Sequence, residues 1–270
     1  MAPLGSAALA FDSIAGSFDA RFGTWLSVAA QRRAVHRALA EAFPKGAKVI
    51  DVGGGTGEDA RWLIERGREV LLTDASPAMI AAASAKLGPG ASAECIPAER
   101  LGMLADKFGE ACFDGAYSNF AALNCVSDLD SFAAGLARLL RPGALALLVL
   151  FGTMCPMEMM VEATRGRPRN IFRRFARGDA HARLGGHDFT IRYHRSSAFR
   201  KAMAPWFEPH GRQAIGLFVP PSAAEPWISR HPRLLRMLEA LDNQLAAPLA
   251  AFGDHVQYRF VRTEVPAPRQ

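Results

Sequence analysis

A glycine-rich turn and a downstream aspartate are the residues of this chain best suited to bind a nucleoside. The segment Asp51-Val52-Gly53-Gly54-Gly55-Thr56-Gly57 completes an apolar run that begins at Lys48. Glycines let a backbone turn tightly from a strand into a helix and approach a ligand closely. Asp74 follows 17 residues after Gly57, where a carboxylate can accept hydrogen bonds from both hydroxyls of a ribose. Together these residues predict a nucleoside-binding crevice.

The apolar pattern around these residues predicts βαβ units. Short continuous apolar runs alternate with helical segments from Lys48 onward, which is typical of a buried parallel sheet flanked by helices. Ser76 and Pro77 suit the start of one helix, and Gly88-Pro89-Gly90 suits its end. The expected strands are Lys48–Val52, Val70–Thr73, Ser92–Ile96, Asp114–Asn119 and Ala144–Phe151, and the expected helices are 57–66, 76–87 and 129–140. We therefore predict an α/β fold with a doubly wound, Rossmann-like, seven-stranded and mostly parallel sheet.

The chain divides into four predicted parts. Residues 1–45 form an N-terminal helical lid, and residues 46–152 form the Rossmann-like core. Residues 153–212 are basic and irregular apart from a strand-like stretch at Asp188–His194, and such a long connection indicates a lid or substrate-recognition insert. Residues 213–270 complete the sheet with strands at Gln213–Val219 and His255–Arg262 and a helix at Leu234–Leu245.

In this order, the motifs resemble those of the class I S-adenosylmethionine-dependent methyltransferases, over roughly residues 11–152. The first motif of that family is an acidic residue two positions before a G-x-G-x-G loop, matched here by Asp51, Gly53, Gly55 and Gly57. The resemblance implies that the cofactor is S-adenosylmethionine, that the loop and Asp51 face its amino acid part, and that Asp74 binds its ribose.

The resemblance also implies the remaining cofactor contacts. Ala75 and Met79 fall where neighbours of the adenine ring lie. Pro97 occupies the place of an aspartate that often contacts the adenine amino group, so the backbone around Ala98, or Glu99, is expected to replace it. The full expected cofactor set is Asp51, Gly53, Gly54, Gly55, Gly57, Asp74, Ala75, Met79, Ala98, Glu99, Asn119, Phe120 and Phe18, the last replacing a tyrosine and bringing no hydroxyl.

Three residues are candidates for catalysis. Asn119 belongs to a segment that resembles the fourth motif of the family, which lies between cofactor and acceptor; the alternative is packing at a strand end. His187 and His194 lie in the predicted insert and could act as general bases, with a surface role as the alternative. The four cysteines form no CxxC pair, so no metal site is predicted.

Composition indicates a globular protein with a local basic region. The chain has 270 residues, half of them apolar, and a formal charge of +6. Seven arginines fall within residues 165–183, and the stretch 165–177 mixes them with aromatic residues that could rest on anionic lipid; a solvated basic face is the alternative. No apolar run approaches the length of a membrane span, and no basic leader precedes the first apolar stretch, so we expect a cytoplasmic protein.

The predicted activity is methyl transfer from S-adenosylmethionine to a small, hydrophobic or lipid-like acceptor, mainly by positioning. Two rival classes remain. A nucleic-acid methyltransferase or binding protein would suit the basic insert, but an Asn/Asp-Pro-Pro-aromatic motif does not follow the fourth strand, so no nucleic acid partner is expected. An NAD(P)-dependent oxidoreductase would need a third glycine at Glu58.

Overall fold

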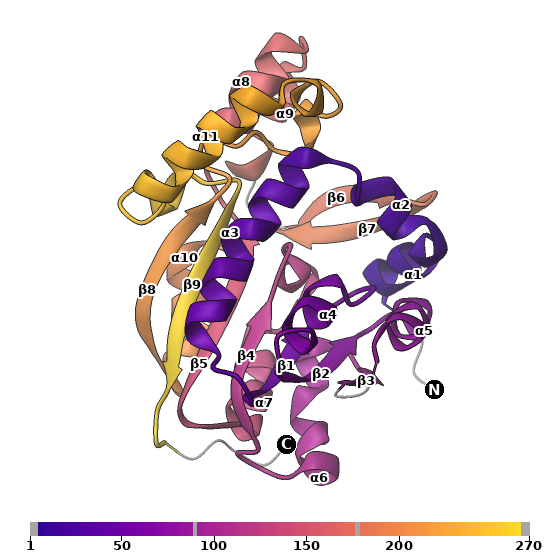
Figure 1. The fold of residues 1–270 in the computed structure, drawn as a ribbon, viewed down its shortest axis with the longest axis vertical. Coiled ribbons are helices and arrows are strands. Elements are labelled where there is room, and N and C mark those ends of the chain that lie inside the picture. Colours follow the sequence, from indigo (N-terminus) through magenta and orange to yellow (C-terminus); the bar gives the residue numbers. More distant parts are fainter. Residues whose placement is uncertain (1–4, 89–90, 176–178, 266–270) are drawn as a thin grey trace.

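The computed structural model describes residues 5–88, 91–175 and 179–265. Its centre is a seven-stranded sheet in the order β3-β2-β1-β4-β5-β9-β8 (Figure 1). Strands β1 to β5 pair in parallel, and β9 runs antiparallel to both of its neighbours, so the predicted mostly parallel, doubly wound fold is confirmed. The strands are β1 (Lys48–Val52), β2 (Glu69–Asp74), β3 (Ala91–Cys95), β4 (Phe113–Ser118), β5 (Leu140–Phe151), β8 (Phe207–Ile215) and β9 (His255–Arg262).

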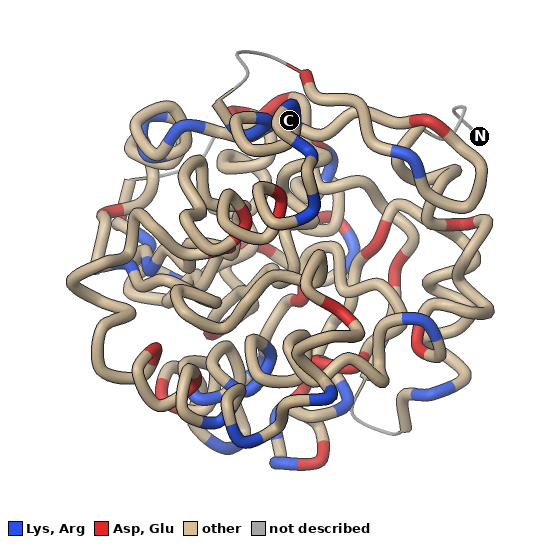
Figure 2. Tube along the Cα trace, turned by 90° about the horizontal axis from the view of Figure 1, so that it is seen from above, with Lys and Arg blue, Asp and Glu red and all other residues tan. Residues whose placement is uncertain are grey.

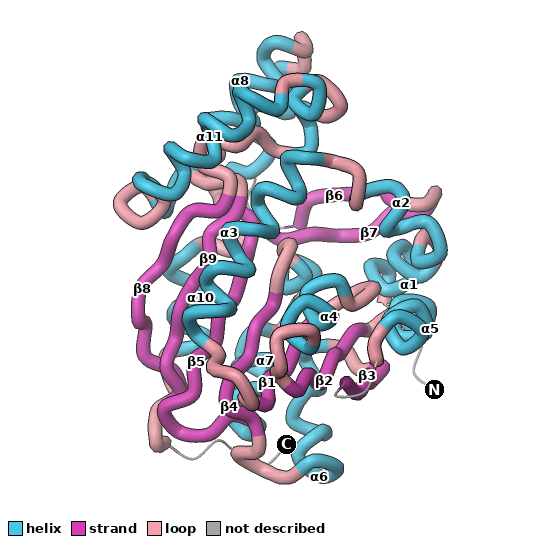
Figure 3. The backbone as a smooth tube through the Cα atoms, in the orientation of Figure 1, coloured by secondary structure: helices cyan, strands magenta, loops and turns pink. Residues whose placement is uncertain are grey.

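Helices cover both faces of the sheet (Figure 3). Successive side chains of a strand point to opposite faces, so Ile50 and Val52 of β1 enter one apolar cluster and Val49 enters the other. The first cluster packs beneath α7 (Leu129–Leu139) and α10 (Ser196–Met203), with α6 (Ala105–Phe108) at its edge. The second packs beneath α3 (Leu26–Ala42), α4 (Glu58–Ile64) and α5 (Pro77–Lys86).

The remaining elements lie at the carboxyl ends of the parallel strands (Figure 1). Two N-terminal helices, α1 (Ser6–Asp12) and α2 (Phe18–Phe22), lie beside a hairpin of β6 (Asp179–Leu184) and β7 (His187–Arg192). Phe11 of α1 meets Phe189 of β7 edge to face, with ring centroids 5.7 Å apart. Three further helices lie beyond the ends of β5, β8 and β9: α8 (Pro156–Thr164), α9 (Pro168–Ile171) and α11 (Pro232–Leu245).

Several elements differ from the expected boundaries. β8 begins at Phe207 and not at Gln213. After the buried Phe207, residues 208–212 are exposed and carry a β-bulge between Pro209 and Arg212, which hides the strand pattern. The helix α10 lies inside the stretch expected to be irregular, and its Phe199 is fully buried in the core. The expected strand Asp188–His194 is β7 of the hairpin. Pro89 and Gly90 of the expected helix stop, and residues 176 and 177 of the basic stretch, lie outside the described residues.

Within the described ranges, no helix combines the length and apolar character needed to cross a bilayer. The division into four parts stays a prediction.

Candidate functional site

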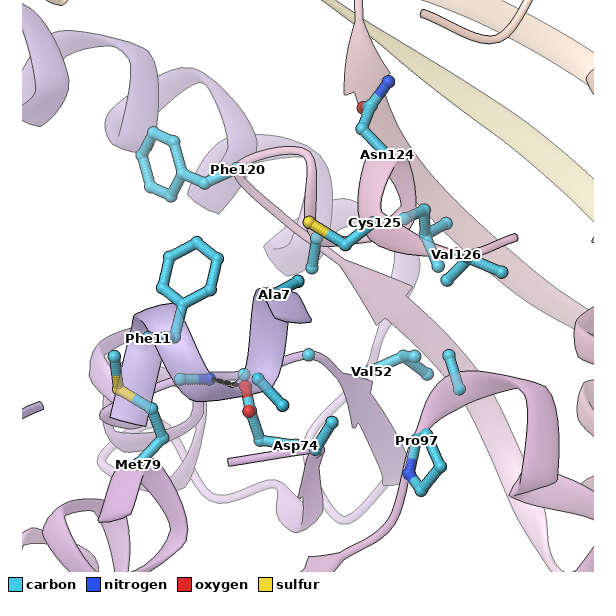
Figure 4. Close-up of a pocket in the computed structure, with 18 of the residues that line it drawn as sticks. Ala7, Phe11, Val52, Asp74, Met79, Pro97, Phe120, Asn124, Cys125 and Val126 are labelled. Carbon is cyan, nitrogen blue, oxygen red and sulfur yellow. Dashed lines mark hydrogen bonds between the residues drawn. The ribbon is translucent and has the colours of Figure 1, made fainter. Parts of the chain in front are cut away.

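A cavity of about 450 Å³ opens at the carboxyl ends of β1, β2 and β4 (Figure 4). Ligands of doubly wound sheets bind at this edge, where the strand order reverses direction. Its floor is the glycine loop after β1, and its walls include Asp74, Met79 and Pro97. Phe11 of α1 and the loop after β4 close it from the other side.

The glycine loop leaves its backbone open to the cavity. Gly55 has a φ of +55°, which residues with a side chain rarely adopt, and a Cβ placed on it would meet no atom within 4 Å. The space beside Gly55 therefore belongs to the cavity. A Cβ on Gly53, in contrast, would lie 2.4 Å from the Cβ of Ala122, so this glycine allows the loop after β4 to pack closely.

Asp74 is held in place by two backbone donors. The N–H of Gly55 donates to its Oδ2 at 3.0 Å, and the N–H of Ser76 donates to its Oδ1 at 2.9 Å. Burial raises the pKa of this carboxyl, and the hydrogen bonds from Ser76 and Gly55 oppose the effect. Each oxygen keeps a lone pair that a ribose hydroxyl can use.

Asp51 carries a buried carboxyl group beside the cavity. It is 1% exposed, its Oδ2 has no donor at hydrogen-bond geometry among the described residues, and the hydroxyl of the buried Tyr117 is its polar neighbour. Burial raises the pKa of Asp51 well above its usual range, and the nearby charge of Asp59 adds to this effect. A buried carboxyl oxygen that lines a cavity without a partner suits a ligand that brings a positively charged donor. The ammonium group of an amino acid is such a donor.

Behind the glycine loop lies an ion-pair network that the sequence analysis missed. Asp59 of α4 accepts from Arg32 at 3.2 Å and contacts His36 Nε2 at 2.7 Å. Burial would raise the pKa of Asp59, but Arg32 and His36 hold it below its usual value. Arg32 also lines the cavity and lies over the ring of Phe120, 4.8 Å from its centroid. The network places a cation from the N-terminal helix α3 beside the loop.

The same network fixes Asn119. Its Nδ2 donates to Asp59 Oδ2 at 2.8 Å, and its Oδ1 accepts from the N–H of Phe120 at 2.7 Å. Phe120 and Ala121 both adopt positive φ, so the chain turns sharply here. Asn119 therefore positions the loop after β4 in this conformation.

Two aspartates fasten the N-terminal helices over the cavity. Asp12 accepts from the Ser76 hydroxyl and from the N–H of Ala78, each at 2.8 Å, and Ser76 in turn caps α5. Asp19 accepts from the Thr56 hydroxyl and from Lys86 Nζ, each at 2.6 Å. These contacts, which we call the aspartate straps, join α1 and α2 to the glycine loop and to α5.

The hairpin supplies the last wall. The main-chain oxygen of Arg192 accepts from the Asn124 side chain, and Arg192 Nη1 donates to the main-chain oxygen of Ser127 at 2.9 Å. Arg192 also pairs with Asp179, and both line the cavity. Nothing in their spacing along the sequence indicated this contact, because it depends on how the hairpin folds back.

Most predicted cofactor residues line this cavity. Gly57 does not: it has a φ of +83° and precedes α4, with a Cβ there 3.3 Å from Leu72 and Ala83 side chains. The other predicted cofactor residues are all in the lining: Asp51, Gly53, Gly54, Gly55, Asp74, Ala75, Met79, Ala98, Glu99, Asn119, Phe120 and Phe18.

The two candidate histidines lie elsewhere. His187 is exposed at the start of β7, and His194 is half-buried after it, with its pKa lowered by burial. Neither belongs to the described lining of the cavity, so we do not propose either as a general base. Among the described residues, no group of three or more His, Cys, Asp or Glu side chains could hold a metal ion.

The comparisons with known proteins agree with the observed sheet order. Residues 49–143 match the family described as "Methyltransferase domain". The chain is 30% identical over 149 residues to the biotin biosynthesis bifunctional protein BioHC of Cellvibrio japonicus, a match that covers 54% of this chain and 28% of that protein. The chain thus spans little more than a quarter of that relative's length.

Solved structures show the same fold. An S-adenosylmethionine-dependent methyltransferase from Mesorhizobium loti superposes with a TM-score of 0.54 at 20% identity, covering 86% of this chain and 98% of that one. The 1,6-didemethyltoxoflavin-N1-methyltransferase of Burkholderia thailandensis, solved with S-adenosylhomocysteine, also gives 0.54 at 20% identity, covering 98% and 93%.

The sheet order and the cavity together define a Rossmann-like α/β domain. Within it, residues 49–143 match the methyltransferase-domain family.

Proposed function

We propose that this protein transfers the methyl group of S-adenosylmethionine to a small acceptor with a largely apolar body. The observation that carries the proposal is the pair of aspartates in one cavity. Asp74 presents a carboxylate held by two backbone N–H groups, and Asp51 presents a buried oxygen without a partner. A ribose diol and an amino acid ammonium, the two polar ends of this cofactor, fit these two groups.

The other lining residues support the same assignment. Arg32 brings a cation that suits the carboxylate of the cofactor's amino acid part. Met79, Ile96 and Pro97 provide an apolar slot beside Asp74 that suits the adenine ring. Bound there, the cofactor supplies an activated methyl group on a sulfonium, so the protein has to orient the acceptor and exclude water.

The acceptor side of the cavity is mostly apolar. Phe11, Phe120, Cys125 and Val126 face it, with the side chain of Asn124 behind them (Figure 4). Burial raises the pKa of Cys125 to about 12, so its thiol is neutral at physiological pH. A small acceptor with an apolar body matches this wall. Methyl transfer to nitrogen, oxygen or carbon is compatible with these contacts.

An oxidoreductase is less well supported. Glu58 stands where a dinucleotide-binding loop has its third glycine, and it accepts from Lys86 Nζ at 2.7 Å beside the cavity. A pyrophosphate there would meet a carboxylate.

Titration calorimetry with S-adenosylmethionine and S-adenosylhomocysteine tests the proposal. Asp74→Ala removes two charge-assisted hydrogen bonds and should weaken binding by roughly a hundredfold or more. The exposed Asp188 of β7 provides the matched control, and Asp188→Ala should bind as the wild type does. If neither S-adenosylmethionine nor S-adenosylhomocysteine bound the wild type, or if NADH bound more tightly, the proposal would be wrong. Formation of S-adenosylhomocysteine with a panel of apolar amines, phenols and acids then identifies the acceptor class.

A further inference from the structure

The end of the molecule that carries α8, α9 and α11 presents an unusual surface (Figure 1). Two segments form it: residues 156–175, which include α8 and α9, and residues 227–238, which include the first turns of α11. They are neighbours, because Val161 of α8 packs against the buried cluster that contains Ile228 and Leu235. We call this surface the arginine–aromatic face.

The exposed charge of this face has one sign. Of the Lys, Arg, Asp and Glu side chains in these two described segments, all the exposed ones are arginines: Arg165, Arg167, Arg169, Arg173, Arg230, Arg233 and Arg236. The two acids, Glu158 and Glu162, are buried; Glu158 pairs with Arg173 and Arg174, and Glu162 accepts from Asn170 at 2.9 Å. Over the molecule as a whole, basic and acidic positions are interspersed (Figure 2). The exposed charge of the arginine–aromatic face is therefore positive, because its arginines reach the solvent and its two glutamates are buried.

Large apolar side chains lie among these arginines. Phe172 is 62% exposed, and its ring lies 6.2 Å from that of Phe175, which is also exposed. Trp227 is 54% exposed on the second segment, and one methionine on each segment, Met160 and Met237, is also exposed. A cluster of this kind is unfavourable in water and marks a surface that contacts something else.

We propose that the arginine–aromatic face docks the protein on the surface of an anionic phospholipid membrane. Arginine heads can contact lipid phosphates while aromatic and methionine side chains enter the boundary between headgroups and acyl chains. The two methionines favour lipid over nucleic acid, since a phosphate backbone offers them no apolar partner. The face also lies at the carboxyl side of the sheet, because α8 begins five residues after the end of β5 at Phe151. Membrane docking would hold the cavity's side of the molecule near lipid-dissolved acceptors.

Vesicle sedimentation tests this without any assay of methyl transfer. The full chain is mixed with vesicles of phosphatidylcholine alone, or of phosphatidylcholine and phosphatidylglycerol in equal parts. The wild type should bind only the anionic vesicles, and added salt should release it. The triple variant Arg165→Ala, Arg167→Ala, Arg169→Ala should bind about fivefold more weakly for each arginine removed, roughly a hundredfold in all. Phe172→Ser with Trp227→Ser should also weaken binding at unchanged charge.

A matched control removes the same charge elsewhere. Arg195, Arg200 and Lys201 are exposed at and on α10, away from the face, and their combined replacement by alanine should leave vesicle binding within about twofold of the wild type. Calorimetry with S-adenosylhomocysteine checks that each variant keeps its cavity. Equal binding to both vesicle types, equal losses in the patch and control variants, or binding of RNA by the arginines without vesicle binding would each overturn the proposal.

Discussion

At the scale of single residues, Gly55 and Asp51 leave an open space and a polar group that the folded protein does not itself use. Gly55 adopts a φ that other residues avoid, and Asp51 keeps a buried carboxyl oxygen without a partner. The buried oxygen costs stability in the absence of ligand, whereas the positive φ at position 55 is tolerated because the residue is glycine. A local cost of this kind is typical of binding sites, because the ligand supplies the missing contact.

Gly55→Val should abolish cofactor binding while the sheet stays folded. The branched side chain would occupy the open space beside the loop and weaken binding roughly a hundredfold or more. The positive φ adds backbone strain of about 1–2 kcal/mol. Gly46 is the matched control: its φ is +82°, its Cβ would also meet no atom within 4 Å, and it lies outside the cavity lining. Calorimetry and circular dichroism on Gly46→Val and Gly55→Val separate the filling of the cavity from the backbone strain. Equal affinities of the two variants for the cofactor would contradict the proposal that the glycine loop binds it.

Asp51→Asn should stabilise the ligand-free protein and weaken binding. Burial raises the pKa of Asp51 above its unfolded value, so the folded state of the wild type loses stability as pH rises through that raised pKa. The amide does not titrate, and the variant's advantage should grow with rising pH and then level off. Its melting temperature should exceed that of the wild type by roughly 2–4 °C per kcal/mol recovered. Calorimetric scans from pH 4 to 8 measure this, and a lower melting temperature at every pH would refute it.

At the scale of elements, a buried arginine ties the first part of the insert after β5 to the core. Arg174 of the turn η4 (Arg173–Phe175) pairs with Glu158 of α8 and with Asp254 before β9. It also donates to the main-chain oxygen of Gly152 at 3.1 Å. Removing Arg174 would therefore leave Glu158 and Asp254 buried without this cation, and point variants test its role.

Arg174→Met should destabilise the protein by about 3–5 kcal/mol, because it removes the partner of two buried acids. The neighbouring Arg173 is half exposed and contacts the same Glu158, so Arg173→Ala should cost less than about 1 kcal/mol. Urea denaturation of the two variants makes the comparison. Similar losses in both would show that the buried network does not anchor the insert.

The sequence predicted β1 and β9 to the residue and the helix cap at Ser76, because continuous apolar runs and local capping chemistry decide those elements. It misplaced the start of β8, where residues 208–212 are exposed at the sheet edge and show no apolar alternation. In the cavity it found the loop and Asp74, which follow directly from strand ends. It missed Arg32, Asp59 and Arg192, because contacts between segments 27 or more residues apart leave no local pattern.

At the scale of the whole molecule, the cavity is enclosed by two segments that lie far apart in the sequence. The N-terminal helices cover one side, and the hairpin of β6 and β7 covers the other, with Phe11 and Phe189 in contact between them. The apolar cluster around Ile14, Ala15 and Met79 is separate from the two large core clusters. The N-terminal cover can therefore open without unfolding the sheet, and its opening should control the passage of ligand.

The aspartate straps should set the rate of that opening. Asp12→Ala with Asp19→Ala removes four hydrogen bonds between the N-terminal helices and the core, each contributing about 1 kcal/mol. Loss of even part of this restraint should speed dissociation of S-adenosylhomocysteine by at least tenfold, measured by stopped-flow displacement. Both aspartates lie outside the ribose and amino acid contacts, so association should change less than dissociation. Asp130→Ala, at an exposed position on α7, controls for loss of charge. A dissociation rate equal to that of the wild type would mean that ligand leaves by the hairpin side, between Arg192 and Ser127.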